Sequence, residues 1–177
     1  DCGARILYLV GIHNKRTLQD AVPLFRAIRD PRNTVLFHFD VKFGLDEYRR
    51  SDLRYEVEAC PCGAFVEVAS LHNCSWGSWS MLQPTLWSMK HAVEHPDHVG
   101  KWDVYINLSG DTLPVYSQDR IAKLFAGPLH NINFVTSSSC ETGLRPTPIS
   151  AFPKKWHKRT HYSHRPANLE YTDDDGV

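Results

Sequence analysis

Short apolar runs alternate with amphipathic segments along the first 137 residues of the chain. Each run is bounded by polar or turn-forming residues, which is typical of buried strands, and each segment between runs has the spacing of a helix. The expected strands are 5–12, 33–40, 64–70, 102–109 and 132–137, and the expected helices are 17–28, 44–59, 78–95 and 117–126. Strands that alternate with helices in this way predict βαβ units, and therefore an α/β fold with a mostly parallel sheet flanked by helices.

Two of these helices carry finer expectations about where they begin and which face is buried. The hydroxyl of Thr17 is predicted to cap the first helix, and Pro23 inside it is expected to move the true start later. In the helix at 78–95, four apolar residues recur on one face, which we expect to pack on the core: Leu82, Leu86, Met89 and Val93.

Polar or small residues follow each of the first four expected strands. Right-handed crossovers bring the carboxyl ends of parallel strands to one edge of the sheet, where such folds bind their ligands. The strand at 102–109 is expected to be central, with Ser109-Gly110-Asp111 as its exit onto this binding edge. The segments expected at this edge are 11–14, 40–42, 70–76 and 109–112.

The composition narrows the class of protein. The chain has 177 residues, of which 42% are hydrophobic and 23% charged, which favours a globular domain over a disordered chain. Its 20 basic and 20 acidic residues balance, which argues against a nucleic-acid partner. The chain begins without Met and ends in acidic sequence, so we expect a piece of a longer protein. We expect one partial domain over 1–177, with an α/β region at 5–137 and irregular chain at 138–177.

The five cysteines are an odd number, so at least one thiol is free or pairs outside this chain. Cys60-Pro-Cys62 is one residue too short for the C-x-x-C spacing of a zinc site. A role in disulfides is compatible with this number of cysteines, and the spacing leaves their pairing open.

Several residues have both a chemical and a structural interpretation. A single glycine in "LVGIHNKR" argues against a dinucleotide-binding loop. Asp40 either caps a turn or accepts hydrogen bonds from a ribose or base. Asp111 has Leu113 where a D-x-D pair needs its second carboxylate, so it is a poor metal ligand by itself.

Two further segments remain open between alternatives. His91 and His95 match the H-x-x-E-H pattern of a zinc peptidase, but the helical phase places both on the solvent side. The basic stretch 154–166 is either a solvated loop or a contact for phosphate or an acidic glycan.

Four motifs in order carry a family resemblance from about Arg5 to Phe134. They are "VGIH", His38-Phe39-Asp40, "SWGSWSML" and "INLSGDTLP". Together they resemble the core-2/I-branching enzyme and peptide O-xylosyltransferase family, glycosyltransferase family 14. The resemblance implies a GT-A-like, Rossmann-type sheet whose C-terminal half is incomplete here. It also implies inverting transfer of GlcNAc or xylose from a UDP-sugar to a glycan or protein acceptor, with no metal or other cofactor.

The resemblance also implies roles for particular positions. Ile12 and His13 would lie against the uracil or ribose, Asp40 would bond the uridine, and Trp76 would form a wall. The residues expected to bind the nucleotide sugar are Ile12, His13, Asn14, Asp40, Ser75, Trp76 and Asp111.

This chain departs from the family pattern at two points. The family usually carries Asp one position later, where this chain has Thr112. The general base and the basic residues that neutralise the diphosphate are expected beyond residue 177, and neither Glu141 nor Glu170 lies in a matching motif. The fragment alone is therefore expected to be inactive as an enzyme.

Members of the family are type II proteins of the Golgi lumen, so a membrane anchor is expected upstream of Asp1. Two alternatives to an active transferase are kept. One is a non-catalytic glycan- or nucleotide-binding relative of the same fold, and the other is the zinc peptidase built on His91 and His95.

Overall fold

The computed structural model describes residues 3–60 and 64–133. All of the elements below lie in one compact unit, Asp1–Asn131, and a second unit covers Ile132–Val177. The expected strand at 132–137 and the boundary expected at 137 fall almost wholly outside the described residues. No helix among the described residues is both long and apolar enough to cross a lipid bilayer.

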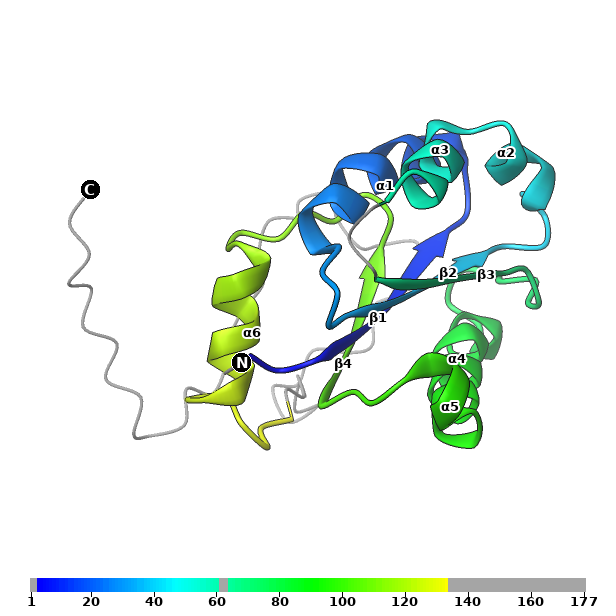
Figure 1. Cartoon of the computed structure of the whole chain (residues 1–177). Helices are drawn as coiled ribbons and strands as arrows, with labels where there is room; N and C mark the ends of the chain where they lie inside the picture. The colour runs from blue at the N-terminus through cyan, green and yellow to red at the C-terminus, as the bar shows by residue number, and fades with distance from the viewer. Residues whose placement is uncertain (1–2, 61–63, 134–177) are drawn as a thin grey trace, which may run out of the picture. The chain divides into compact units, whose positions relative to one another are not determined.

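Four parallel strands form the sheet, in the order β3-β2-β1-β4 (Figure 1). The predicted α/β class with a parallel sheet is therefore confirmed. The sequence placed the last of these strands at the centre, whereas β1 is central and β4 is at the edge of the described sheet. The burial explains the difference, because β1 is almost fully buried and β4 is mostly half-exposed. The strands are β1 (Ile6–Ile12), β2 (Thr34–Phe39), β3 (Phe65–Ala69) and β4 (Val104–Ser109).

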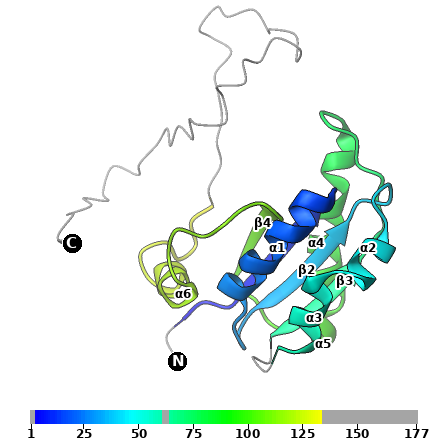
Figure 2. The same ribbon diagram turned by 90° about the horizontal axis from the view of Figure 1, so that it is seen from above.

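Helices α1 (Lys15–Ile28) and α3 (Asp52–Glu58) cover one face of the sheet, as Figure 2 shows from above. Alternate residues of β1 and β2 point into this core, where they meet the apolar stripe of α1. The segment expected as one helix at 44–59 is divided into α2 (Leu45–Arg49) and α3. Ser51 causes the break, because its side chain accepts a hydrogen bond from the Arg54 N–H and caps α3.

The first helix begins earlier than predicted. Asn14 is its capping residue, and its side-chain oxygen accepts a hydrogen bond from the Thr17 N–H at 2.9 Å. The Thr17 hydroxyl accepts the Asn14 N–H at 3.1 Å in return, so the two residues form a reciprocal capping box. Pro23 lies inside the helix and does not delay its start.

Helices α4 (Gln83–Glu94) and α5 (Pro96–Val99) lie on the opposite face of the sheet (Figure 1). A single turn of 3-10 helix, η1 (Trp79–Met81), precedes α4. The second core forms here, between the strands and the two helices. Its buried members are Leu7, Leu9, Leu36, Ala92 and Val99.

The buried face of α4 is not the one predicted from its apolar spacing. Pro84, Ser88 and Ala92 face the sheet instead, because small side chains allow close approach and the Ser88 hydroxyl bonds Tyr105 Oη at 2.8 Å. The four residues expected in the core are 38–69% exposed: Leu82, Leu86, Met89 and Val93.

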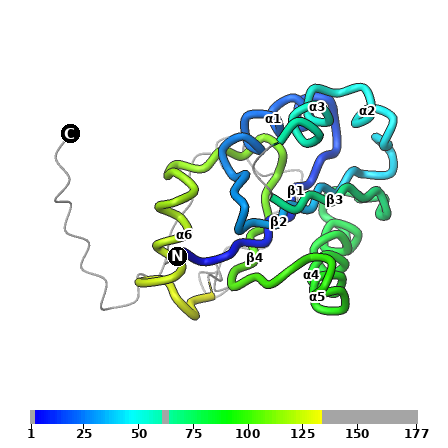
Figure 3. Tube along the Cα trace, in the orientation of Figure 1, coloured from blue at the N-terminus to red at the C-terminus, as the bar shows by residue number. Residues whose placement is uncertain are grey.

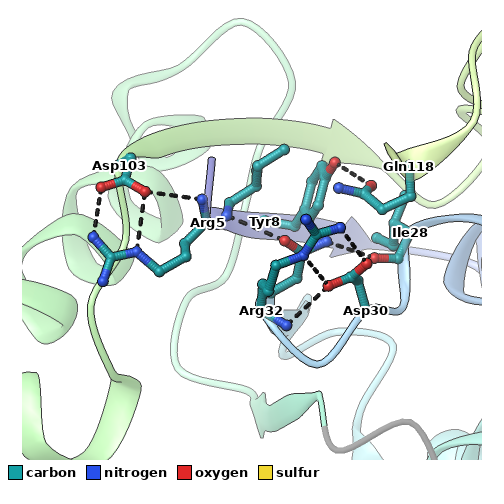
Figure 4. Close-up of polar contacts among 9 residues, drawn as sticks. Arg5, Tyr8, Ile28, Asp30, Arg32, Asp103 and Gln118 are labelled. Atoms are coloured by element: carbon teal, nitrogen blue, oxygen red, sulfur yellow. Dashed lines mark hydrogen bonds and ion pairs between the residues drawn. The ribbon is translucent and has the colours of Figure 1, made fainter. Parts of the chain in front are cut away.

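Polar contacts fasten the strands at the end of the sheet remote from the strand exits (Figure 4). The Arg5 guanidinium donates two hydrogen bonds to the carboxylate of Asp103, at 2.6 and 3.0 Å, which holds the start of β1 to the segment before β4. The guanidinium also keeps the pKa of Asp103 below its usual range. Nearby, the buried Tyr8 hydroxyl donates to Gln118 Oε1 at 2.8 Å.

The last described helix, α6 (Gln118–Ala126), begins after Ser117, as predicted. The trace in Figure 3 brings it beside the start of the chain, where the Ala4 N–H donates to the Ala122 carbonyl at 2.9 Å. These contacts fix the amino ends of the strands, while their carboxyl ends border the site.

Candidate functional site

A cavity of about 630 Å³ lies at the carboxyl ends of β1, β2 and β4, next to the first turn of α4. The chain leaves β1 toward β2 on one side, while β4 pairs on its other side, so the strand order reverses here. Open α/β sheets bind ligands at such a switch point. The volume also lies within the range of pockets for nucleotide-sized molecules.

The floor of the cavity is the part of the sheet that α4 leaves uncovered. Gly11 pairs with His38 on β2 and with Ser109 on β4, so these three residues lie side by side across the sheet. Leu9 and Asn107 form the neighbouring pair and also line the cavity. The floor is therefore polar or small toward the strand exits, and further in it is apolar at Leu9 and polar at Asn107.

Two side chains that follow β2 hold the loop at 70–76 by hydrogen bonds: the carboxylate of Asp40 and the ammonium group of Lys42. The Cys74 N–H donates to Asp40 Oδ2 at 3.2 Å, and Lys42 Nζ donates to the Cys74 carbonyl at 2.8 Å. The other Asp40 oxygen accepts the Lys42 N–H at 2.9 Å. Asp40 is buried, yet it lines the cavity together with Lys42 and Cys74.

His38 holds the beginning of the same loop by hydrogen bonds. Its Nε2 accepts the N–H of His72 at 3.2 Å and that of Leu71 at 3.5 Å, which requires the proton to be on Nδ1. Burial, with a further contribution from His72, lowers the pKa of His38 to about 4, although Asp40 acts in the opposite direction. His38 is therefore a neutral acceptor near pH 7.

Four of the seven residues predicted to bind the nucleotide sugar line this cavity: Ile12, His13, Asp40 and Trp76. Trp76 is 81% exposed and His13 is exposed, so both offer surface to a ligand at the rim. Ile12 is only 1% exposed because its side chain packs in the core with α1. It borders the cavity but offers a ligand little side-chain surface.

The other three predicted residues do not line the cavity. Asn14 uses its side-chain oxygen to cap α1. Ser75 supports the loop, because its N–H donates to Ser80 Oγ at 2.8 Å. The carboxyl of Asp111 interacts with the Ser109 hydroxyl, which lowers its pKa. The structure thus gives each of them a local partner, which for Asp111 is Ser109 of the cavity floor.

Gly110 explains the abrupt change from apolar strand to glycine and carboxylate after β4. A Cβ at this position would overlap the Thr17 carbonyl oxygen, because the exit of β4 passes directly over the first turn of α1. The Gly110 N–H also donates to the Gly11 carbonyl at 2.9 Å, which continues the pairing of β4 with β1. Only glycine allows this approach, and it sets the position of Ser109 at the floor.

The histidine pair of the zinc-peptidase hypothesis lies elsewhere, on the far part of α4. The prediction that His91 faces solvent is wrong, because its Nε2 lies 2.9 Å from Glu67 Oε2 on β3 and its ring stacks on Trp87. The buried face of α4 differs from the predicted one, which rotates His91 toward the sheet. Among residues 3–60 and 64–133, no group of three or more His, Cys, Asp or Glu side chains is placed to hold a metal ion.

Sequence reasoning did not single out several side chains of the cavity wall. Lys42 and Cys74 were included only as members of strand-exit segments, and Cys74 has a free thiol. Asn107 and Thr85 were missed, although an asparagine inside an apolar strand is a recognisable signal. Thr85 gives no signal of its own, since its place at the wall depends on how α4 packs.

The fold and the cavity define an α/β domain with its ligand site at the carboxyl edge of a parallel sheet, the arrangement of nucleotide-binding folds. The family model Branch, described as Core-2/I-Branching enzyme, matches residues 8–168. The chain belongs to this family, and it is a glycosyltransferase of the core-2/I-branching type with a GT-A-like fold. A search of curated proteins gives no significant match.

Proposed function

We propose that this chain forms the donor-binding part of an inverting, metal-independent glycosyltransferase that uses a UDP-sugar. The transferred sugar would be GlcNAc or xylose, and the acceptor a glycan or a glycoprotein. The observation that carries the proposal is the cavity at the switch point, whose wall includes Ile12, His13, Asp40 and Trp76 in a member of the core-2/I-branching family.

The chemistry of the wall suits a nucleoside. Trp76 and His13 offer flat aromatic surfaces at the rim, and Asp40 offers a carboxylate whose oxygens each retain a lone pair beyond the hydrogen bonds from the Lys42 and Cys74 N–H groups. Such a carboxylate accepts hydrogen bonds from a ribose hydroxyl or from the N–H of uracil. The ammonium group of Lys42 adds positive charge at the same wall, where a diphosphate would be favoured.

Metal independence is proposed because Asp111 is the single carboxylate of the segment 109–113 that follows β4. Asp111 has Leu113 two positions later, and its carboxyl already interacts with the Ser109 hydroxyl. Hard divalent cations need several oxygen ligands, which this segment does not supply by itself. The charge that develops on the leaving UDP would then be met by basic side chains.

Calorimetric titration of the chain with UDP, once with manganese and once with EDTA, tests the proposal. Equal binding in both conditions is the expected result. Binding that needs manganese would contradict metal independence. Absence of binding by the folded chain, and also by a longer form that includes the downstream residues, would contradict a UDP-sugar site. Binding without transfer by that longer form would instead indicate a non-catalytic relative.

We further propose that the protein works in the Golgi lumen, held by an anchor upstream of Asp1. The family assignment motivates this location. Fractionation of cells that express the complete protein, with protease protection of the lumenal side, tests it. A cytosolic distribution would refute the proposal.

A further inference from the structure

Gly11 leaves a gap in the cavity floor that neither the backbone nor the packing of the described residues requires. It does not have the positive φ that would demand glycine. A Cβ built at this position would meet only the Leu108 carbonyl oxygen within 4 Å, at the ordinary contact distance of 3.8 Å. The other residues of β1 are buried, whereas Gly11 is half-exposed and lines the cavity. Glycine inside a strand often marks the close approach of a ligand.

Asn107 stands beside this gap with unused hydrogen-bonding capacity. It lies on the same face of the sheet as Gly11, since Leu9 pairs with Asn107 and Gly11 with Ser109. Its Nδ2 donates to Thr85 Oγ1 at 2.9 Å, which orients the carboxamide. The side chain is exposed and lines the cavity, so one N–H and the carbonyl oxygen remain free for a ligand.

The gap lies between two polar groups on either side of β1. Asp40 follows β2 and Asn107 belongs to β4, so two strand spacings, about 10 Å, separate them across the sheet, and the register separates them by a further four residues, about 13 Å, along the strands. An elongated molecule that lies along the floor, such as a nucleotide sugar, would reach both groups.

We propose that Gly11 and Asn107 form a floor subsite that recognises a flat group carrying an N–H beside a carbonyl. The missing side chain of Gly11 would admit the group, and the Asn107 carboxamide would pair with its N–H and carbonyl. This inference rests on the proposed function, since a UDP-sugar offers such an edge in its uracil ring; the N-acetyl group of UDP-GlcNAc has its N–H and carbonyl pointing in opposite directions, so it would offer the carboxamide only one of them. The subsite adds two residues that determine which ligand fits.

The test compares Gly11→Ala and Asn107→Ala with the unaltered 177-residue chain. Each is titrated with uridine, UDP, UDP-glucose and UDP-GlcNAc, and thermal unfolding checks that each variant is folded. An added methyl in a filled pocket should weaken binding about ten-fold or more, and loss of the carboxamide about five-fold. Losses with all four probes would identify the uracil ring and support the subsite, whereas losses confined to UDP-GlcNAc would place the N-acetyl group there and overturn the paired recognition of an N–H beside a carbonyl.

Ser88→Ala is the matched control for Asn107→Ala. Ser88 bonds Tyr105 on the same interface between α4 and β4, but it does not line the cavity. It should leave the affinity for every probe unchanged. If Ser88→Ala weakens binding as much as Asn107→Ala, the carboxamide acts through the helix packing and the proposal is overturned.

The two levels of the proposal fail in different ways. If the unaltered chain binds UDP but both floor variants bind every probe equally well, the subsite is wrong and the proposed function stands. If neither the unaltered chain nor the longer form with the downstream residues binds any of the probes, the proposed function fails together with the subsite. Should Gly11→Ala not fold, Asn107→Ala decides the outcome, because its exposed side chain can be removed without opening the core.

Discussion

The neutral state of His38 is expected to make the stability of the protein fall in mild acid. In the folded protein the Nε2 lone pair is used by the N–H groups of His72 and Leu71, and burial opposes a charge on the ring. Protonation would replace this acceptor by a donor facing two other donors. The folded state therefore resists a proton that the unfolded chain accepts freely.

The sign and size of the effect follow from the two pKa values. The pKa of His38 falls from 6.5 to about 4 on folding. Between these values the unfolded state binds more protons, so stability is present above pH 6.5 and is lost as the pH falls toward 4. The full shift corresponds to about 3 kcal/mol, of which about 2 kcal/mol is lost by pH 5.

Urea unfolding followed by tryptophan fluorescence, at pH 7.5 and 5.0, measures this loss. His38→Gln keeps a side-chain acceptor for the loop but does not titrate, so its stability should fall by about 2 kcal/mol less than that of the unaltered chain. His130→Gln, which removes an exposed histidine, should behave as the unaltered chain does. Equal losses for the unaltered chain and His38→Gln would refute the reasoning.

Three further changes test the contacts that position the site. Gly110→Ala should destabilise the fold by about 3 kcal/mol in urea unfolding, because its methyl overlaps the Thr17 carbonyl, and a smaller effect than 1 kcal/mol would contradict this approach. Asn14→Ala should cost about 1 kcal/mol by the same assay, since it removes the cap of α1. Burial raises the pKa of Tyr8 to about 12, so the contribution of this phenol is present below pH 10 and lost toward pH 12. Tyr8→Phe should abolish that alkaline loss but leave Gln118 Oε1 without its donor, at a cost of about 1–3 kcal/mol.

The strands were predictable because buried parallel strands are continuous apolar runs, and the pattern needs no tertiary information. The buried face of α4 was not, because the pattern assumes that a helix buries its largest apolar residues. Here Tyr105 and Asn107 of β4 face α4. They form hydrogen bonds with Ser88 and Thr85 of the helix. Polar pairing and close approach therefore outweighed apolar spacing.

Only those parts of the site that belong to recognisable sequence motifs were predictable. The motif around Asp40 and the position of Trp76 brought the correct strand exits into view, since parallel strands share one edge. The hydrogen bond from Lys42 to the Cys74 carbonyl joins residues 32 positions apart, and it depends on how the loop at 70–76 folds back over β2. Local sequence patterns hold no information about such a closure.

Asp40 both holds the loop at 70–76 and lines the cavity proposed for the nucleotide, so experiments on this residue need a comparison variant. Its carboxylate accepts the N–H groups of Lys42 and Cys74, so Asp40→Ala would release the loop that carries Trp76 as well as any direct contact with a nucleotide. A loss of UDP binding in that variant alone is therefore no proof of contact. Lys42→Met provides the comparison, because it releases the Cys74 carbonyl while Asp40 stays in place. With uridine, which has no phosphate for Lys42 to meet, a direct contact requires Asp40→Ala to weaken binding clearly more than Lys42→Met does. Equal losses would mean that Asp40 acts by holding the loop.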